Sequence, residues 1–417
     1  MAKQNCIVAQ AGGPTAVINN SLYGVIKQAK KQPEIGKIYG AINGVIGILR
    51  EELVDLGKEN KEILNGLTFT PGAALGSCRY RLGSEREGLE EINKIIENLS
   101  RYGMKYFFYI GGNDSMDTAN KIYEIAMSRG YDLRVIGIPK TIDNDLVLTD
   151  HCPGFGSAAK CIATAVREAG YHAESLYGVE KVTILETFGR NTGWLAGASA
   201  LARKSATDAP HLIYFPEVPF SLHKFKEDVK KICMKIGGAF IVAAEGIKDE
   251  KGNLFSLQTR SFSADSFGHP VLGKAGYFLT EFVNQEMGLV AQNIKPDISQ
   301  QSAAHLIARV DAQEAKMVGE EAVKYAVSGK SGFMVTLVRN NGPTHNCTTS
   351  LAELGVVANR ERKIPRNWIS EQGNFVKQDF IRYVHPLIQG EIKVPLKEGL
   401  PAYVRLKRCR ISQLQNE

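Results

Sequence analysis

Six short apolar segments recur along the chain, and each is almost continuously hydrophobic rather than alternating. They lie at 6–13, 105–112, 134–140, 181–190, 239–246 and 332–339. Strands that are buried on both faces of a parallel sheet have this pattern. Each segment ends in glycine or polar residues, and helical patterns lie between them. The pattern predicts an α/β protein with parallel-rich sheets and helices on both faces.

Helical periodicity links these predicted strands. Residues 115–130 form one apolar face, and Asp114 or Ser115 is placed to cap that helix. Residues 157–170 repeat the design. We therefore predict two Rossmann-like lobes, with ligands bound in the cleft at the carboxyl ends of the strands. The predicted divisions are an N-terminal lobe at 1–145, a second lobe at 146–340 and a basic C-terminal extension at 341–417 packed on the lobes. The second lobe is expected to have its own sheet, which includes the strand near 333.

Composition indicates an ordinary globular protein. The 417 residues are 44% hydrophobic and 23% charged. The seven cysteines form no CxxC pair, which argues against a disulfide framework or a zinc site. No signal peptide precedes the first apolar segment, and no apolar run approaches the length of about 18 residues that spans a bilayer. We therefore predict a cytoplasmic protein that does not bind membranes.

The net charge of +7 is concentrated near the C-terminus. Residues 345–417 hold 12 Lys and Arg against 7 Asp and Glu, notably in the segments 360–366 and 405–410. A nucleic-acid-binding patch is one interpretation. A solvated surface or an attraction for anionic metabolites is the interpretation that we favour, so we predict no nucleic-acid partner.

Glycine pairs follow two of the predicted strands. Gly12 and Gly13 precede a predicted helix, and Gly111 and Gly112 stand in the stretch IGGNDSMD. The exposed N–H groups at the start of a helix attract phosphate. A plain turn explains each pair equally well.

The segment 139–145, PKTIDND, carries a stronger chemical signal. Lys140 can neutralise a phosphate, Asp143 can accept a proton from a hydroxyl, and Asp145 can hold a divalent cation or orient the base. The alternative is a turn in which Asp and Asn form local hydrogen bonds. The strands before Gly111 and Lys140 belong to one βαβ unit, so their loops are expected to face each other.

These motifs resemble the phosphofructokinases, and more narrowly their pyrophosphate-dependent branch. The resemblance covers about residues 5–340 in order. It rests on GGNDS at 111–115, TIDND at 141–145, LETFGRNTGWLA at 185–196 and AAEG at 243–246, and YVHPLIQGE at 383–391 is similar to the C-terminal region of that branch.

The resemblance implies reversible phosphoryl transfer from pyrophosphate to the 1-hydroxyl of fructose 6-phosphate, with Mg²⁺ as cofactor in a homodimer or homotetramer. The N-terminal lobe is then the phosphoryl-donor side and the second lobe the sugar-phosphate side. Asp143 is the implied general base, which Thr141 and Asp145 assist, and Lys140, Asp114 and Arg190 are the other implied catalytic residues. The implied donor site is Gly13, Arg79, Gly112, Asp114 and Lys140; the implied sugar site is Thr141, Asp143, Phe188, Gly189, Arg190, Glu245 and Gln301; the implied metal site is Asn113 and Asp145.

Three departures bear on the substrates, the first from the ATP-dependent members and the other two from the family as a whole. Asp114 replaces a glycine, so its carboxylate is expected to repel the α-phosphate of ATP but not the shorter pyrophosphate. Asn113 replaces a metal-associated aspartate, and Gln301 replaces an arginine that grips the sugar phosphate. Two alternatives stay open: an ATP-dependent 6-phosphofructokinase, or a catalytically weak regulatory subunit that binds phosphosugars.

Overall fold

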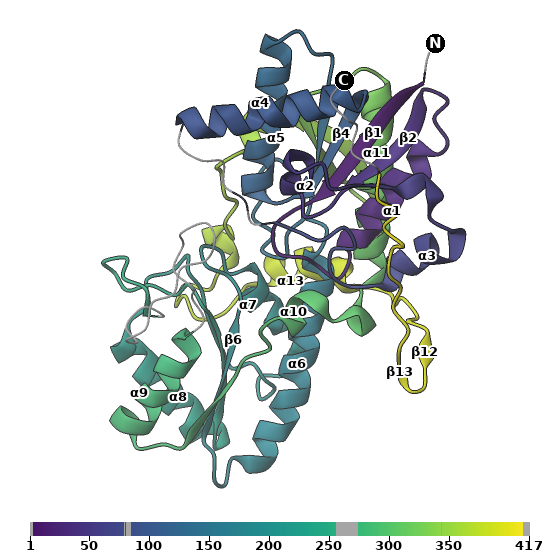
Figure 1. Ribbon diagram of the computed structural model, residues 1–417. Coiled ribbons are helices and arrows are strands. Elements are labelled where there is room, and N and C mark those ends of the chain that lie inside the picture. Colours follow the sequence, from purple (N-terminus) through teal and green to yellow (C-terminus); the bar gives the residue numbers. More distant parts are fainter. Residues whose placement is uncertain (1–2, 79, 81–84, 256–273, 343, 412–417) are drawn as a thin grey trace.

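Two β-sheets, each covered by helices, form the two lobes of the molecule (Figure 1). The structure is a computed structural model, and it describes residues 3–411 except 79, 81–84, 256–273 and 343, and not the side chains of 85–87. The predicted α/β class is confirmed. Among the described residues, no helix is both long and apolar enough to cross a membrane.

The first sheet has seven strands. Those in its centre run parallel, and an antiparallel strand closes each edge. In spatial order they are β11 (Cys347–Glu353), β10 (Phe333–Arg339), β5 (Arg134–Pro139), β4 (Met104–Gly111), β1 (Gln4–Gln10), β2 (Ile35–Ala41) and β3 (Leu53–Asp55).

Alternate side chains of the central strands enter two separate cores. In β1, Ile7 and Ala9 pack into one core while Cys6 and Val8 pack into the other. Both faces are therefore apolar, which explains the continuous hydrophobic runs. One face is covered by α1 (Ile18–Ala29) and α11 (Arg309–Val327), and the other by α2 (Val45–Leu49), α4 (Glu85–Arg101), α5 (Asn113–Ser128) and α12 (Leu354–Val357).

The second sheet is fully parallel and smaller. Its order is β7 (Leu212–Tyr214), β8 (Ala239–Ala244), β6 (Val182–Thr187) and β9 (Ala291–Ile294). One face packs on α6 (Phe155–Leu176), α7 (Trp194–Ala198) and α13 (Gln378–Val384), and the other on α8 (Leu222–Ile236) and α9 (Ala275–Met287). Smaller elements are α3 (Lys61–Gly66), α10 (Ser299–Ser302), and the hairpin of β12 (Leu396–Lys397) and β13 (Leu400–Pro401).

All six predicted strands are present, but the assignment of 332–339 to the second lobe is wrong. This strand, β10, pairs in parallel with β5 of the first sheet. The chain returns to the first lobe with α11, which packs closely on α1: a Cβ added at Gly319 would lie 2.2 Å from the carbonyl oxygen of Ser21. The other predicted boundaries stay predictions.

The predicted cap of α5 is also wrong. The N-cap residue is Gly112, and Asp114 and Ser115 lie within the first turn. Asp114 is therefore released from a capping role, and its carboxylate is exposed.

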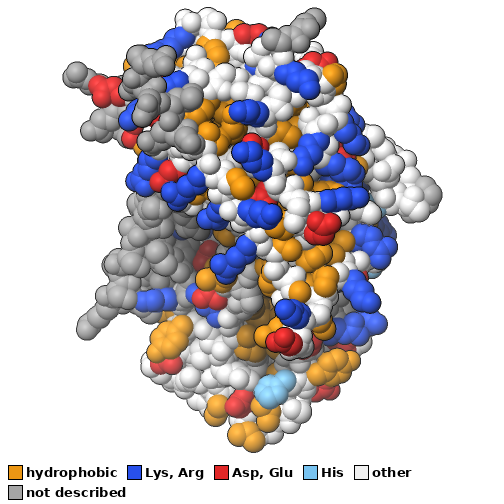
Figure 2. Space-filling model, turned by 45° about the vertical axis from the view of Figure 1, so that its right-hand side comes forward, with side chains coloured by type: hydrophobic (Ala, Val, Ile, Leu, Met, Phe, Trp, Pro, Cys, Tyr) orange, Lys and Arg blue, Asp and Glu red, His pale blue; other side chains and the backbone are white. Residues whose placement is uncertain are grey.

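Charged side chains on the surface are mixed rather than segregated. Figure 2 shows Lys and Arg spread over one face, interspersed with acidic and hydrophobic side chains. This distribution is typical of a solvated surface.

Candidate active site

A cavity of about 1130 Å³ lies where the strands of both sheets end. Parallel strands present their carboxyl ends at one edge, so the loops that follow them meet there. Of the residues predicted for the site, those that line this cavity are Gly13, Gly112, Asn113, Asp114, Lys140, Thr141, Asp143, Asp145, Phe188, Arg190, Glu245 and Gln301. Arg79 lies outside the described residues. The chemical roles of all these residues stay predictions.

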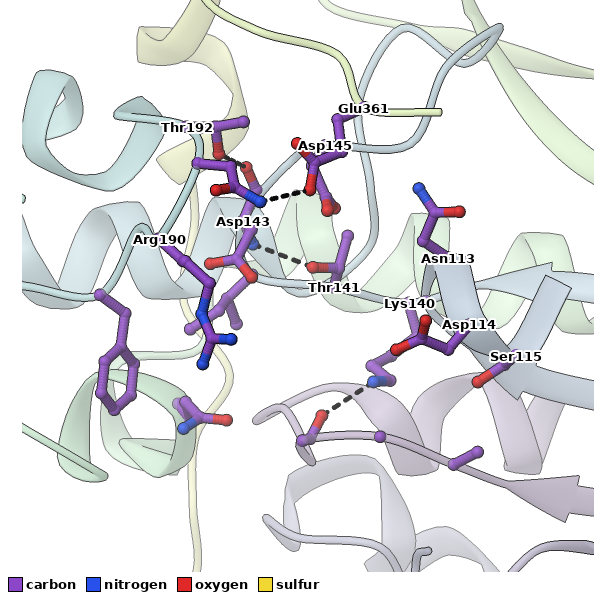
Figure 3. Close-up of a pocket in the computed structure, with 18 of the residues that line it drawn as sticks. Asn113, Asp114, Ser115, Lys140, Thr141, Asp143, Asp145, Arg190, Thr192 and Glu361 are labelled. Carbon is purple, nitrogen blue, oxygen red and sulfur yellow. Dashed lines mark hydrogen bonds between the residues drawn. The ribbon is translucent and has the colours of Figure 1, made fainter. Parts of the chain in front are cut away.

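The loops after β4 and β5 face each other, as predicted. Gly111 is paired with Pro139 in the parallel ladder, and the backbone N–H of Lys140 donates to the carbonyl of Gly111 over 3.0 Å. Asp114 and Lys140 lie on the same side of the cavity, opposite Arg190 (Figure 3). The two loops therefore place an anion and a cation at one end of the cavity.

Lys140 is held beside the first glycine loop. The residue is only 3% exposed, and Nζ donates to the carbonyl oxygen of Gly13 over 2.8 Å (Figure 3). Gly12 has φ +73°, and a Cβ there would lie 3.1 Å from the Lys140 Nζ. A side chain at position 12 is therefore disfavoured by both backbone strain and the ammonium group.

The turn between Asp143 and Asp145 directs two carboxylates into the cavity. Asn144 has a left-handed backbone (φ 54°) and is fully buried; its amide accepts from the N–H of Cys152 over 3.0 Å and donates to the hydroxyl of Tyr383 over 3.0 Å. Thr141 Oγ1 accepts from the Asp143 N–H over 3.0 Å. Asn144 thus fixes the turn from behind.

Burial makes both carboxylates more basic than usual. Burial and the charge of Glu245 raise the pKa of Asp143 to about 6, against the opposing effects of Lys140 and Arg190. Burial and the charge of Asp143 raise the pKa of Asp145 to about 7. A carboxylate with a pKa near neutrality suits general base catalysis.

A third carboxylate comes from the C-terminal part of the chain. Glu361 lies near Asp145 (Figure 3), and its charge contributes to the raised pKa of both Asp143 and Asp145. Its Oε1 accepts a hydrogen bond from Asn191 Nδ2 over 2.7 Å. Asp145 Oδ1 is buried and has no hydrogen-bond partner among the described residues. The three carboxylates form an acidic group open to a cation.

The opposite end of the cavity is built on the loops after β6 and β8. Gly189, which does not line the cavity, has φ +134° and accepts from the Gly246 N–H over 3.2 Å, which sets the position of Arg190. Burial and the charge of Glu186 raise the pKa of Glu245 to about 7. Gln301 and Lys295 also line the cavity, and the Lys295 ammonium lies 3.8 Å from the Glu186 carboxylate and 3.6 Å from that of Asp297.

Sequence reasoning missed the contribution of residues 359–363. Asn359, Glu361 and Lys363 line the cavity, although RERK was interpreted as surface charge. Arg362 anchors the segment: it donates to the carbonyls of Asn144 (3.0 Å) and Thr149 (2.9 Å) and lies 4.8 Å from the ring centre of Trp194. No local sequence signal marked this segment, because its place at the cavity depends on contacts with residues far away in the sequence.

Asn113, predicted to bind metal, serves this segment. Its amide oxygen accepts from the N–H of Asn359 over 2.6 Å, and its NH₂ donates to the carbonyl of Arg360. The described structure therefore shows Asn113 as a clamp on the backbone, and its metal role stays a prediction.

The cavity combines a buried lysine, an arginine and carboxylates with raised pKa values at the strand ends of a two-lobed α/β fold. Phosphoryl transfer to a hydroxyl requires neutralisation of charge and a base, so these features define a phosphotransferase-like site. The family model for phosphofructokinase matches residues 5–325, and the chain belongs to this family.

Three comparisons show where the chain stands within the family. It is 40% identical to the pyrophosphate–fructose 6-phosphate 1-phosphotransferase of Xanthomonas campestris over 415 residues, 99% of this chain and 98% of the relative. It is 33% identical to the sulfofructose kinase of Alkalicoccus urumqiensis, covering 88% and 92%. The pyrophosphate-dependent phosphofructokinase of Nitrosospira multiformis matches with a TM-score of 0.91 at 37% identity, covering 100% and 99%.

Proposed function

We propose that this enzyme reversibly transfers a phosphoryl group from pyrophosphate to the 1-hydroxyl of fructose 6-phosphate, giving fructose 1,6-bisphosphate and phosphate. Relatives that match over almost the full length carry this activity in their names. The observation that carries the proposal is the position of Asp114 and Lys140, on one side of the cavity that also contains Asp143.

The donor is proposed to lie at the end formed by Gly13, Asp114 and Lys140. The buried ammonium of Lys140 attracts a compact polyanion, and the Asp114 carboxylate disfavours a longer chain of phosphates. Pyrophosphate satisfies both conditions, because it ends before a third phosphate would be required.

The acceptor is proposed to lie between Asp143 and the loops after β6 and β8. The Asp143 carboxylate takes the proton of the sugar 1-hydroxyl. The hydroxyl oxygen forms a bond to a phosphorus atom of pyrophosphate, and the bond between that phosphorus and the bridging oxygen breaks. Arg190 and Lys295 face the anionic end of the sugar, and Glu245 binds sugar hydroxyls. Phosphate leaves with the charge that Lys140 neutralises.

The acidic group fits a Mg²⁺ ion, which prefers oxygen ligands. We propose that Asp145, whose buried Oδ1 has no hydrogen-bond partner in the described part of the chain, and Glu361 hold the ion. Bound there, Mg²⁺ would neutralise phosphate charge. Glu361→Gln should raise the Mg²⁺ concentration needed for half-maximal activity about tenfold or more. The exposed Glu371→Gln should leave it unchanged, and equal Mg²⁺ dependence in the two variants would remove Glu361 from the site.

A second candidate acceptor is the 6-sulfo analogue of fructose. Gln301 stands where the family usually has an arginine for the sugar 6-phosphate, and a sulfonate carries less charge than a phosphate. The sulfofructose kinase relative makes this a concrete alternative.

We also propose a homodimer or homotetramer, which light scattering of the purified protein would test.

The deciding experiment measures formation of the 1-phosphorylated sugar with each donor and acceptor at saturating Mg²⁺. We expect kcat/KM to be at least tenfold higher with pyrophosphate than with ATP, and higher with fructose 6-phosphate than with its sulfo analogue. Faster turnover with ATP would identify the ATP-dependent alternative. Phosphosugar binding without turnover from either donor would identify the regulatory alternative.

A further inference from the structure

A second group of polar side chains lies behind the loop that carries Asp143 and Asp145. It contains His151 from the β5–α6 connection, Glu314 from α11, and His345 and Cys347 at the β10–β11 connection. One potential ligand atom from each residue lies within 4.8 Å of all the others. None of these residues lines the catalytic cavity.

Three contacts join the group directly. Glu314 accepts at both oxygens, with His151 Nε2 at 2.7 Å and His345 Nε2 at 2.8 Å. The thiol of Cys347 lies 3.8 Å from His345 Nε2. In a tetrahedral zinc site, bonds of about 2.0–2.3 Å place neighbouring ligand atoms about 3.3–3.7 Å apart. Small side-chain shifts therefore suffice to enclose an ion.

The group is shielded from water. The exposed fractions of the side chains are 1% for His151, 6% for Glu314 and 9% for His345, and Cys347 is 5% exposed. Surface clusters of acidic residues are common without metal, but two imidazoles, a thiol and a carboxylate buried together are the donor set of a zinc site.

The surroundings of His151 are those of a metal ligand. Its Nδ1 contacts the Asp150 carboxylate at 2.7 Å, and Asp150 is itself held by Arg339 Nε at 3.0 Å. A carboxylate on the remote nitrogen of a ligating histidine orients the ring and increases its basicity. His345 differs from His151, because its remote nitrogen, Nδ1, is buried with no hydrogen-bond partner among the described residues.

We propose that His151, Glu314, His345 and Cys347 bind one Zn²⁺ ion with a structural role. The charges of Zn²⁺, one carboxylate and one thiolate cancel, so the site is neutral when filled. The absence of a CxxC pair does not count against it, because the ligands come from three segments far apart in sequence. This inference is independent of the proposed function.

A competing state without metal is a proton shared by the same groups. Burial alone would lower the pKa of His151, but the charges of Glu314 and Asp150 raise this pKa to about 9. Displacing that proton near pH 7 weakens metal binding about a hundredfold. Structural zinc sites bind tightly enough to tolerate this loss. Bound zinc would join α11 and the β10–β11 connection to the loop that follows Asp145.

The test uses the full chain purified without chelator. We expect about one zinc per chain by elemental analysis. Replacing it with Co²⁺ should give the intense visible bands of four-coordinate cobalt and a sulfur-to-cobalt charge-transfer band. Co²⁺ bound to the catalytic carboxylates would be six-coordinate, weakly coloured and without the sulfur band, so the two sites are distinguishable.

Cys347→Ser should remove the sulfur band and lower Co²⁺ affinity at least tenfold, whereas Cys409→Ser, the matched control, should preserve both. Chelator treatment should lower the Tm of the wild-type chain but not that of Cys347→Ser. The proposal is overturned if wild-type protein, shown folded by circular dichroism, shows no sulfur band with excess Co²⁺ and no zinc by elemental analysis.

Discussion

The choice of phosphoryl donor is predicted to depend on the charge of Asp114. This side chain lies in the first turn of α5, exposed at the wall of the cavity, while Lys140 is buried beside Gly13. Asp114→Gly removes the carboxylate but leaves Lys140 in place. We expect this variant to bind ATP more tightly, because the repulsion between the carboxylate and the α-phosphate is lost.

The exposure of Asp114 sets the magnitude of the effect. Two unit charges about 4 Å apart repel by about 1 kcal/mol in water and about 4 kcal/mol at an effective dielectric constant of 20. Because Asp114 is exposed, we expect about 1–2 kcal/mol, which corresponds to a 5- to 30-fold gain in ATP affinity. The thousandfold effect of a buried pair is not expected. Lys140→Gly should instead lower kcat with pyrophosphate about 10²- to 10³-fold.

The assay compares KM for ATP and for pyrophosphate in a coupled measurement of fructose 1,6-bisphosphate formation. Glu124→Gly is the matched control, because it removes an exposed carboxylate from the same helix away from the cavity. The control should behave as wild type, and the double variant Asp114→Gly/Lys140→Gly should favour ATP. If Asp114→Gly and Glu124→Gly bind ATP equally weakly, the electrostatic explanation of donor choice is refuted.

Three further predictions concern the base, the packing and the pH dependence. Asp143→Asn should lower kcat about 10²- to 10⁴-fold with little change in KM for fructose 6-phosphate, in the same assay. Gly319→Ala should lower the free energy of unfolding by about 1–3 kcal/mol in urea titrations, whereas Gly178→Ala, which has open space around it, should be close to neutral. Because the pKa of Glu245 is raised to about 7 in the folded state, the stability it contributes is lost as pH rises from about 4.5 to 7. Glu245→Gln should therefore be more stable than wild type by about 1–3 kcal/mol at pH 8 and equal to it near pH 4, as measured by denaturant unfolding at each pH.

The parts of the fold that the sequence predicted are those with local signals. Continuous apolar runs identified the strands, and the polar residues directly after them identified most of the cavity lining. The partner of a strand has no local signal. The apolar run of β10 would suit either sheet. Its pairing with β5 depends on the packing of α11 against α1 at Gly24 and Gly319.

The segment 359–363 escaped prediction for a related reason. Its residues are polar and without periodicity, so nothing in the local sequence separates them from a solvated loop. Asn113 and Asn359 are 246 residues apart in sequence, and only the folded chain brings them within 2.6 Å. Asn113 seemed a weak replacement for an aspartate, whereas its amide suits a clamp that needs one donor and one acceptor.

The raised pKa values of Asp143 and Asp145 have a structural requirement. Two neighbouring carboxylates repel each other, so a flexible loop would move them apart and their pKa values would fall toward normal. The loop is instead held by Arg362, which donates to the carbonyls of Asn144 and Thr149, and the chain that follows it is held where His151 contacts Glu314 of α11. The segment 359–363 therefore has two effects. It places Glu361 beside Asp143 and Asp145, and through Arg362 it restrains the loop that carries these two carboxylates. For this reason, Arg362→Lys should lower kcat even though Arg362 itself does not line the cavity.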